Sequence, residues 1–297
     1  MGLRASPMFT TDSIPIVKPT AGDEEYSALW GVAGPTAKQS LWLIHGLSRR
    51  WEDFAPILSD LTASWHVHAY SHRGHGESAR TPGAYRVADY VPDLAAAVKA
   101  AHKKCVLVGH SLGALVSMGV AAQVPDLVSA VVLLDPPGPR FLSRIETTPY
   151  GTIWAAMRKL AGRADVSAVA KEFADLRVTT AHPGEITRLG DVRDAASIRF
   201  VARCLQDLDP DVFDPPLKKQ WLDGFDMFAV AKQVKCPTLL VVADAEQGGM
   251  LPPEDSKPLA AALPDCSRVD LPGVGHLIHW QDTSATLRLL HAFLGSL

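Results

Sequence analysis

The stretch that decides the fold reads Cys105-Val-Leu-Val-Gly109-His110-Ser111-Leu112-Gly113-Ala114. An apolar run typical of a buried strand leads directly into Gly-x-Ser-x-Gly, and a series of small residues typical of a buried helix follows. A turn this sharp places Ser111 at strained backbone dihedrals, and glycine at 109 and 113 leaves room for neighbouring backbone. The segment therefore predicts a serine whose hydroxyl is held above a sheet as a nucleophile.

Two backbone N–H groups are expected to serve this serine. The N–H of Leu112 lies at the start of the helix, where the helix dipole favours negative charge. A second strand, Leu41–Ile44, ends in His45-Gly46, and Gly46 permits a tight turn that directs the N–H of Leu47 to the same place. Together these N–H groups predict an oxyanion hole for acyl transfer.

A serine nucleophile needs a base from elsewhere in the chain. Near the C-terminus, Leu271-Pro-Gly273-Val-Gly275-His276 places a histidine on a glycine-rich loop after a strand. We therefore predict that His276 is the base. His279, three residues later, is the competing candidate and is more typical of a packing or hydrogen-bonding residue.

Short apolar runs alternate with helical patterns along the chain, as a parallel sheet covered by helices on both faces requires. Helical spacing is clearest over 85–102 and 112–123, and the second of these must be buried because it is apolar on nearly every face. The expected strands are Tyr26–Gly31, Leu41–Ile44, Trp65–Tyr70, Val106–Val108, Val128–Leu134, Thr238–Val242 and Arg268–Leu271.

The strand signal disappears between residues 136 and 235. Helix-like segments rich in tryptophan and phenylalanine take its place, and the alternation resumes after Cys236-Pro237. We expect a helical cap at 136–235, inserted into a single core domain built from 1–135 and 236–297.

Four motifs occur in a fixed order: His45-Gly46, His72-Arg-Gly74-His-Gly76-Glu-Ser78, Gly109-His-Ser111-Leu-Gly113 and Gly273-Val-Gly275-His276. In this order they resemble the α/β-hydrolase superfamily over about residues 40–295. The resemblance implies the α/β-hydrolase fold, with a mostly parallel sheet, helices on both faces and a cap inserted after the strand that follows the serine. It also implies that 72–78 is a structural turn, so we assign no catalytic role there.

The acid that would orient His276 has more than one candidate. The resemblance places it most often beyond the penultimate strand, where this chain has Asp244 and Glu246 but lacks the common Gly-x-x-Asp pattern. A minority of relatives take it from the end of the strand after the serine, where Asp135 follows Ala130–Leu134. A buried acid after five apolar residues needs a partner, which favours Asp135, with Asp244 as the main alternative.

Composition limits the partners. Lys+Arg number 29 and Asp+Glu 32, and the net charge of -3 provides no basic field for nucleic acid or for a membrane surface. The four cysteines are scattered without a C-x-x-C pair, and nothing resembles a secretory signal. We expect a cytoplasmic protein with a small-molecule substrate and no nucleic-acid or membrane partner.

A rival pattern is formed by His66, His68, His72 and His75, whose spacing superficially suggests a zinc hydrolase. The first two fall inside an expected central strand, and Gly74 and Gly76 explain the others as part of a turn. We therefore expect neither a metal nor another cofactor.

The sequence thus predicts a serine hydrolase that acts on a carboxylic ester, lactone or amide through an acyl-enzyme. A carbon–carbon bond hydrolase or perhydrolase with the same triad is an alternative, and a ligand-binding receptor or pseudoenzyme on this fold is the alternative from another class. The candidate residues for an apolar substrate all lie in the expected cap: Trp154, Trp221, Met227 and Phe228.

Overall fold

The computed structural model describes residues 10–16, 26–179 and 185–297. Eight strands form one sheet in the order β1-β2-β4-β3-β5-β6-β9-β10. Two of them, β1 (Thr10–Ile16) and β2 (Tyr26–Ala33), are antiparallel to their neighbours. The other six are parallel: β3 (Ser40–Ile44), β4 (His66–Tyr70), β5 (Cys105–His110), β6 (Val128–Leu134), β9 (Thr238–Ala243) and β10 (Cys266–Leu271). The predicted mostly parallel α/β sheet is confirmed.

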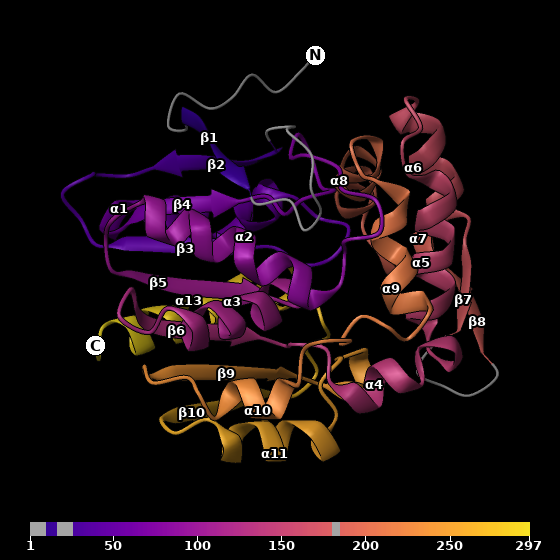
Figure 1. Ribbon diagram of the computed structural model, residues 1–297. Helices are drawn as coiled ribbons and strands as arrows, with labels where there is room; N and C mark the ends of the chain where they lie inside the picture. Colours follow the sequence, from indigo (N-terminus) through magenta and orange to yellow (C-terminus); the bar gives the residue numbers. More distant parts are fainter. Residues whose placement is uncertain (1–9, 17–25, 180–184) are drawn as a thin grey trace.

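Helices cover both faces of the sheet (Figure 1). One face carries α2 (Val87–Ala100), α3 (Leu112–Gln123), α10 (Met227–Ala231) and α11 (Pro253–Ala262), whereas the other carries α1 (Ala55–Ser64), α12 (Ile278–Gln281) and α13 (Thr283–Leu294). Successive strand residues point to opposite faces: Leu41 and Leu43 are buried in one core cluster, Trp42 and Ile44 in the other. Because both faces of the central strands are buried, β3, β5, β6 and β9 read as nearly continuous apolar runs.

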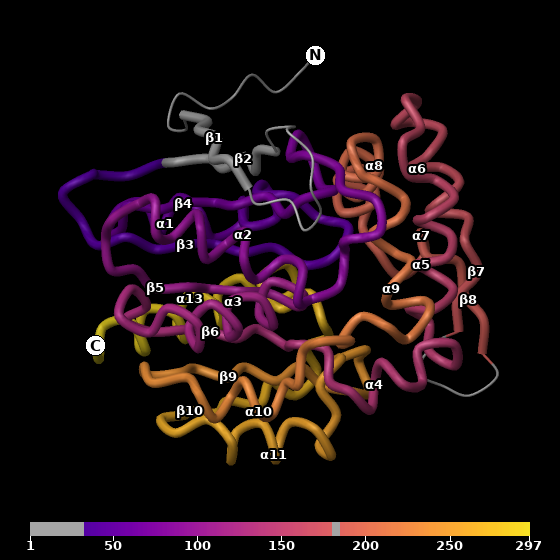
Figure 2. The backbone as a smooth tube through the Cα atoms, in the orientation of Figure 1, coloured from indigo at the N-terminus to yellow at the C-terminus, as the bar shows by residue number. Residues whose placement is uncertain are grey.

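A second group of elements lies beyond the ends of the sheet to which the strand arrows point (Figure 1). Its members are α4 (Pro139–Ser143), α5 (Pro149–Leu160), α6 (Val166–Ala174), α7 (Leu189–Val192), α8 (Ala195–Gln206), α9 (Asp214–Leu217) and the hairpin of β7 (Arg177–Thr179) and β8 (Ile186–Arg188). The backbone trace shows the chain leaving the sheet after β6 and returning to it at β9 (Figure 2). Single 3₁₀ turns lie at η1 (Trp51–Phe54), η2 (Ile145–Thr147), η3 (Pro210–Phe213) and η4 (Ala245–Gln247).

The structure corrects the expected cap at its C-terminal end. Helix α10 falls inside 136–235 but packs against α3 and α11, in the layer that covers the sheet. The helical pattern of this segment shows only that it has an apolar side, and that side can be buried against either layer.

Three strands, β1, β7 and β8, were not predicted. The sequence of β1, Thr-Thr-Asp-Ser-Ile-Pro-Ile, is polar and contains proline, which is tolerated at the edge of a sheet. The short hairpin of β7 and β8 lies in the cap and contributes nothing to the main sheet. Among the described residues, no helix is long and apolar enough to cross a membrane.

Candidate active site

Ser111 occupies the sharp turn between β5 and α3. Its backbone has a φ of 57°, in the left-handed region that a non-glycine residue rarely adopts, and the residue is buried. A Cβ at Gly109 would overlap the backbone of Gly113, and a Cβ at Gly113 would overlap the carbonyl groups of Ile44 and His45. Only glycine therefore allows the strand, the turn and the following helix to approach this closely.

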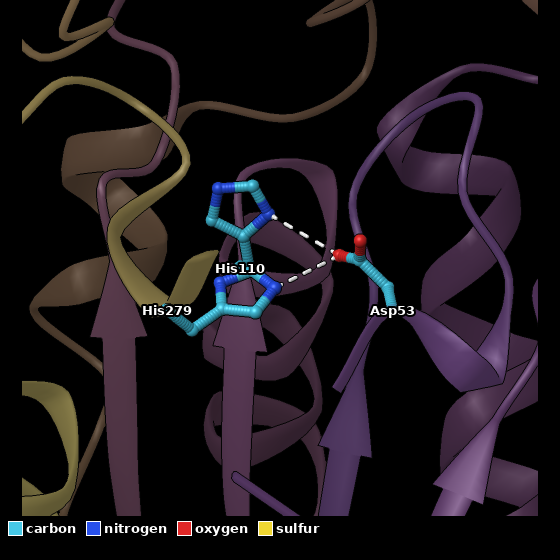
Figure 3. A group of neighbouring side chains, drawn as sticks. All are labelled: Asp53, His110 and His279. Atoms are coloured by element: carbon cyan, nitrogen blue, oxygen red, sulfur yellow. Dashed lines mark hydrogen bonds and ion pairs between the residues drawn. The ribbon is translucent and has the colours of Figure 1, made fainter. Parts of the chain in front are cut away.

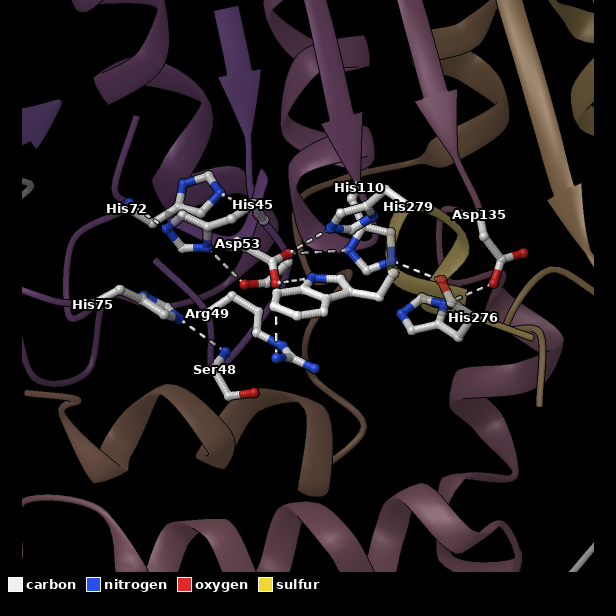
Figure 4. A network of polar contacts seen from close by, with 12 residues as sticks. His45, Ser48, Arg49, Asp53, His72, His75, His110, Asp135, His276 and His279 are labelled. Carbon is white, nitrogen blue, oxygen red and sulfur yellow. Dashed lines mark hydrogen bonds and ion pairs between the residues drawn. The ribbon is translucent and has the colours of Figure 1, made fainter. Parts of the chain in front are cut away.

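His276 and Asp135 are in direct contact. His276 Nδ1 lies 2.7 Å from Asp135 Oδ2, and both side chains are buried (Figure 4). Asp135 follows β6 directly and has a φ of 45°. The pair matches the base and orienting acid of a serine triad in geometry.

Two backbone groups hold the Asp135 carboxylate in place. The N–H of Ala243 donates to Oδ1 at 3.2 Å, and the N–H of Met250 donates to Oδ2 at 2.8 Å. With His276, three donors therefore converge on a carboxylate that has no exposure to solvent. These charge-assisted bonds compensate for the burial of the negative charge.

The alternative acids have local roles. Asp244 Oδ1 accepts from the N–H of Glu246, and Asp244 Oδ2 accepts from the N–H of Gly273 at 2.8 Å. Asp244 thus ties the end of β9 to the loop that carries His276. Glu246 is exposed within η4.

The turn after β3 lies against the candidate nucleophile. A Cβ at Gly46 would stand 2.9 Å from Ser111 Cβ and 3.4 Å from its Oγ, so the backbone that continues into Leu47 passes beside the hydroxyl. Leu112 begins α3 on the other side of Ser111. The predicted donors of an oxyanion hole therefore flank one side chain.

Ser111 and His276 line one small cavity, of about 30 Å³, between the strand ends and the cap. The other lining residues are Gly46, Leu47, Ser48, Arg49, His110, Tyr150, Ile153, Trp154, Met157, Arg193, Met250 and Leu277. Of the four expected substrate contacts, only Trp154 is in this set. A space of this size holds about one water molecule.

The other three expected substrate contacts lie elsewhere. Trp221 packs behind Trp154, with ring centroids 5.6 Å apart. Met227 and Phe228 are on α10, in the core layer. None of these three residues lines the cavity at Ser111, because large apolar residues in the segment also serve packing.

A second buried polar network adjoins the first. His279 Nε2 lies 3.0 Å from Asp53 Oδ2 (Figures 3 and 4). The indole N–H of Trp280 donates to Asp53 Oδ1 at 3.0 Å. Burial alone would raise the pKa of Asp53, but His279 and Arg49 hold it well below the usual range. His279 therefore pairs with Asp53, away from the cavity at Ser111.

His110 connects the two networks. Its Nε2–H donates to the carbonyl oxygen of His276 at 2.8 Å, while its Nδ1 lies 4.0 Å from Asp53 Oδ2. Burial keeps the pKa of His110 well below its ordinary value, so the ring is neutral. The residue before the candidate nucleophile thus bonds to the backbone of the candidate base.

The histidines of the rival zinc pattern do not converge. Trp42 stacks on His68, His72 Nε2 bonds to the carbonyl of His45, and His75 Nδ1 bonds to the carbonyl of Arg73. In the described part of the chain, the one group with converging ligand atoms is Asp53, His110 and His279 (Figure 3). Within this group His279 Nε2 bonds to Asp53 Oδ2 and His110 Nδ1 faces the same oxygen, while His110 Nε2 bonds to the carbonyl of His276.

The sequence analysis missed four residues at or near the site: Arg49, Asp53, Tyr150 and Arg193. Asp53 and Arg49 follow the His45-Gly46 turn, and a residue pair of opposite charge four positions apart was their only signal. Tyr150 and Arg193 come from the cap, where no motif marks a position. Their place at the cavity depends on how the cap packs on the core.

Comparison with known proteins identifies the family. A model of the alpha/beta hydrolase family matches residues 43–288. The chain belongs to this family. 

Two curated relatives are similar over most of their length. A 2-(acetamidomethylene)succinate hydrolase of Mesorhizobium japonicum is 26% identical over 277 residues, which cover 84% of this chain and 86% of the relative. A protein of Pseudomonas syringae pv. syringae, provisionally named as a carbamate hydrolase, is 27% identical over 92% of this chain and 98% of its own. The crystal structure of an E-2-(acetamidomethylene)succinate hydrolase superposes with a TM-score of 0.72 at 21% identity, covering 97% of this chain and 99% of that one.

Proposed function

We propose that this chain is a serine hydrolase that cleaves a carboxylic ester, lactone or amide of a small substrate through an acyl-enzyme. The observation that carries the proposal is the 2.7 Å contact between His276 Nδ1 and Asp135 Oδ2, in a site where His276 and the strained Ser111 line the same cavity. A nucleophile, a base and an orienting acid are the minimal set for this chemistry.

The proposed reaction has two halves. Ser111 Oγ attacks the acyl carbonyl while His276 Nε2 takes the hydroxyl proton, which it then returns to the leaving alcohol or amine. Water, activated by the same imidazole, releases the acid from the acyl-enzyme. Asp135 stabilises the imidazolium in both halves, and the N–H groups of Leu47 and Leu112 receive the negative charge of each tetrahedral intermediate.

The relatives widen the set of substrates to be tried. Their names include an acetamido compound and a carbamate, so acyl groups bonded to nitrogen belong in the assay beside simple esters. The proposed mechanism uses no metal and no organic cofactor. We place the protein in the cytoplasm, because its four cysteines are free thiols, as is usual in a reducing compartment.

The test compares two serine-to-alanine substitutions on neighbouring segments. Ser111→Ala removes the proposed nucleophile and should reduce ester hydrolysis to the uncatalysed background. Ser117→Ala is the matched control, because Ser117 is equally buried on α3 but does not line the cavity. Wild-type rates in folded Ser111→Ala would refute the serine mechanism, and a receptor or pseudoenzyme would show no hydrolysis in any form.

A further inference from the structure

Two arginines line the cavity that contains Ser111. Arg49 comes from the core loop after β3 and is 5% exposed, while Arg193 comes from the cap between α7 and α8 and is partly buried. No aspartate or glutamate is among the described residues that line this cavity. The cap and the core thus each bring a positive charge to the candidate nucleophile.

The Arg49 guanidinium is incompletely satisfied by the protein. Its Nη1 lies 3.7 Å from Asp53 Oδ1 but has no hydrogen-bond partner among the described residues. Asp53 is shared with His279 and Trp280, which both approach within 3.0 Å (Figure 4). The network therefore anchors Arg49 in place and leaves donor capacity on its guanidinium.

The positive charge of Arg193 has fewer partners in the protein than that of Arg49. Within the described residues its side chain forms no hydrogen bond or ion pair, and the nearby Asp194 is exposed and uses its carboxylate to cap α8 through the N–H of Ser197. Burial lowers the pKa of Arg193, and the positive charge of Arg49 adds to this effect. Burying two cations together is costly unless an anion neutralises them.

The geometry points to a carboxylate-binding subsite formed by Arg49 and Arg193 beside Ser111. The substrate class that follows is a small carboxylic acid whose second acyl group, an ester, lactone or amide, is the one cleaved. This inference rests on the proposed function, because it deepens the description of the same cavity. Guanidinium groups suit the planar carboxylate, which each can bind through two parallel N–H bonds.

The remaining walls fix the size and polarity of the rest of the substrate. Leu47, Ile153, Trp154, Met157 and Met250 are apolar and line the same cavity as the two arginines. Because Ser111 and both arginines line one cavity, we expect only a few bonds between the carboxylate and the scissile carbonyl, as in the half-ester of a four-carbon diacid.

The kinetic test uses monoethyl succinate and its neutral analogue ethyl 4-methylpentanoate, in which an isopropyl group replaces the carboxylate. We expect the wild-type protein to prefer the charged ester. Arg193→Gln should lower the ratio of the two kcat/KM values roughly 10- to 100-fold, as expected when one partner of a buried charge pair is removed. Arg49→Gln should act in the same direction.

A matched control is available on the neighbouring helix. Arg199 is exposed on α8 and does not line the cavity, so Arg199→Gln should retain the wild-type preference. A wild-type protein that prefers the neutral ester, or an Arg193→Gln variant that keeps the preference for the charged ester, would overturn the subsite.

A binding measurement separates this proposal from the serine mechanism. Calorimetry on Ser111→Ala should detect monoethyl succinate, and Ser111→Ala combined with Arg193→Gln should bind it at least about 10-fold more weakly. Equal binding by the two proteins would refute the subsite even if Ser111 is the nucleophile. Arginine-dependent binding in a protein whose wild type hydrolyses neither ester would instead refute the proposed function and retain the subsite.

Discussion

His276 Nδ1 lies 2.7 Å from Asp135 Oδ2, although the two residues are 141 positions apart in the chain. The sheet order explains the contact, because β6, β9 and β10 are neighbours and the loops after β6 and β10 emerge at the same edge. With Nδ1 engaged by the carboxylate, Nε2 is the atom left for Ser111.

Asp135→Asn should reduce kcat roughly 10⁴-fold, because an amide in this position stabilises the wrong imidazole tautomer. The amide nitrogen would also face the N–H of Met250, which now donates to Oδ2. Steady-state hydrolysis of monoethyl succinate measures the change.

Asp244→Asn is the matched comparison. This substitution also removes one negative charge and preserves the shape of the side chain, at the end of the adjacent strand. We expect less than about a 10-fold change in kcat, because Asp244 bonds only to backbone groups. An active Asp135→Asn enzyme beside an inactive Asp244→Asn enzyme would assign the acid to Asp244.

His276→Ala and His279→Ala should separate activity from stability. His276→Ala should lower kcat by about 10⁴- to 10⁶-fold, and adding it to Ser111→Ala should change little more, because triad residues act as a unit. His279→Ala removes a partner of the buried Asp53, so urea denaturation should show the larger loss of stability. Full activity in folded His276→Ala would exclude His276 as the base.

The sequence alone predicted the sheet and the sharp turn at Ser111 because both depend on local patterns. All seven expected strands are present, and six of them are parallel strands of one sheet, where short apolar runs can be buried on both faces. Ser111 was predictable because glycine at 109 and 113 is dictated by backbone contacts within a short turn and with β3.

The cavity wall could not be predicted in the same way. Arg193 and Tyr150 reach the cavity through the packing of the cap on the core, and no local pattern encodes that arrangement. For the same reason the sequence could not show that Trp154 lines the cavity whereas Trp221, which packs against Trp154, does not.

Trp154→Ala should therefore raise the KM for monoethyl succinate several-fold, because it removes apolar surface from the cavity wall. Phe228→Ala is the comparison from α10 and should leave KM within about two-fold of wild type, since Phe228 is outside the cavity. Fluorescence-detected unfolding shows whether either protein has lost its packing. A larger rise in KM for Phe228→Ala than for Trp154→Ala would instead assign the substrate contact to α10.

Asp53→Asn should destabilise the fold by about 3 kcal/mol at pH 7, because it leaves His279, Trp280 and Arg49 without their buried carboxylate. The pKa of Asp53 is held well below its usual range in the folded protein, so the stabilisation is present above about pH 4 and is lost as the pH falls further. We expect urea denaturation at pH 7, 5 and 3 to show that the difference in free energy of unfolding between wild type and Asp53→Asn becomes smaller only at pH 3.

Asp60→Asn serves as the control for this experiment, because Asp60 is exposed on α1. It should shift the free energy of unfolding by less than about 0.5 kcal/mol at each pH. If the difference in free energy of unfolding between wild type and Asp53→Asn became larger toward pH 3, this would contradict the assignment of a buried, ionised Asp53.

The central claim, that Ser111 is the nucleophile, is tested most directly by mass spectrometry after reaction with a fluorophosphonate. We predict one adduct per chain, located on the peptide that contains Ser111, absent from Ser111→Ala and formed much more slowly in His276→Ala. An adduct on another residue, or an unlabelled protein that nevertheless hydrolyses monoethyl succinate, would contradict the account.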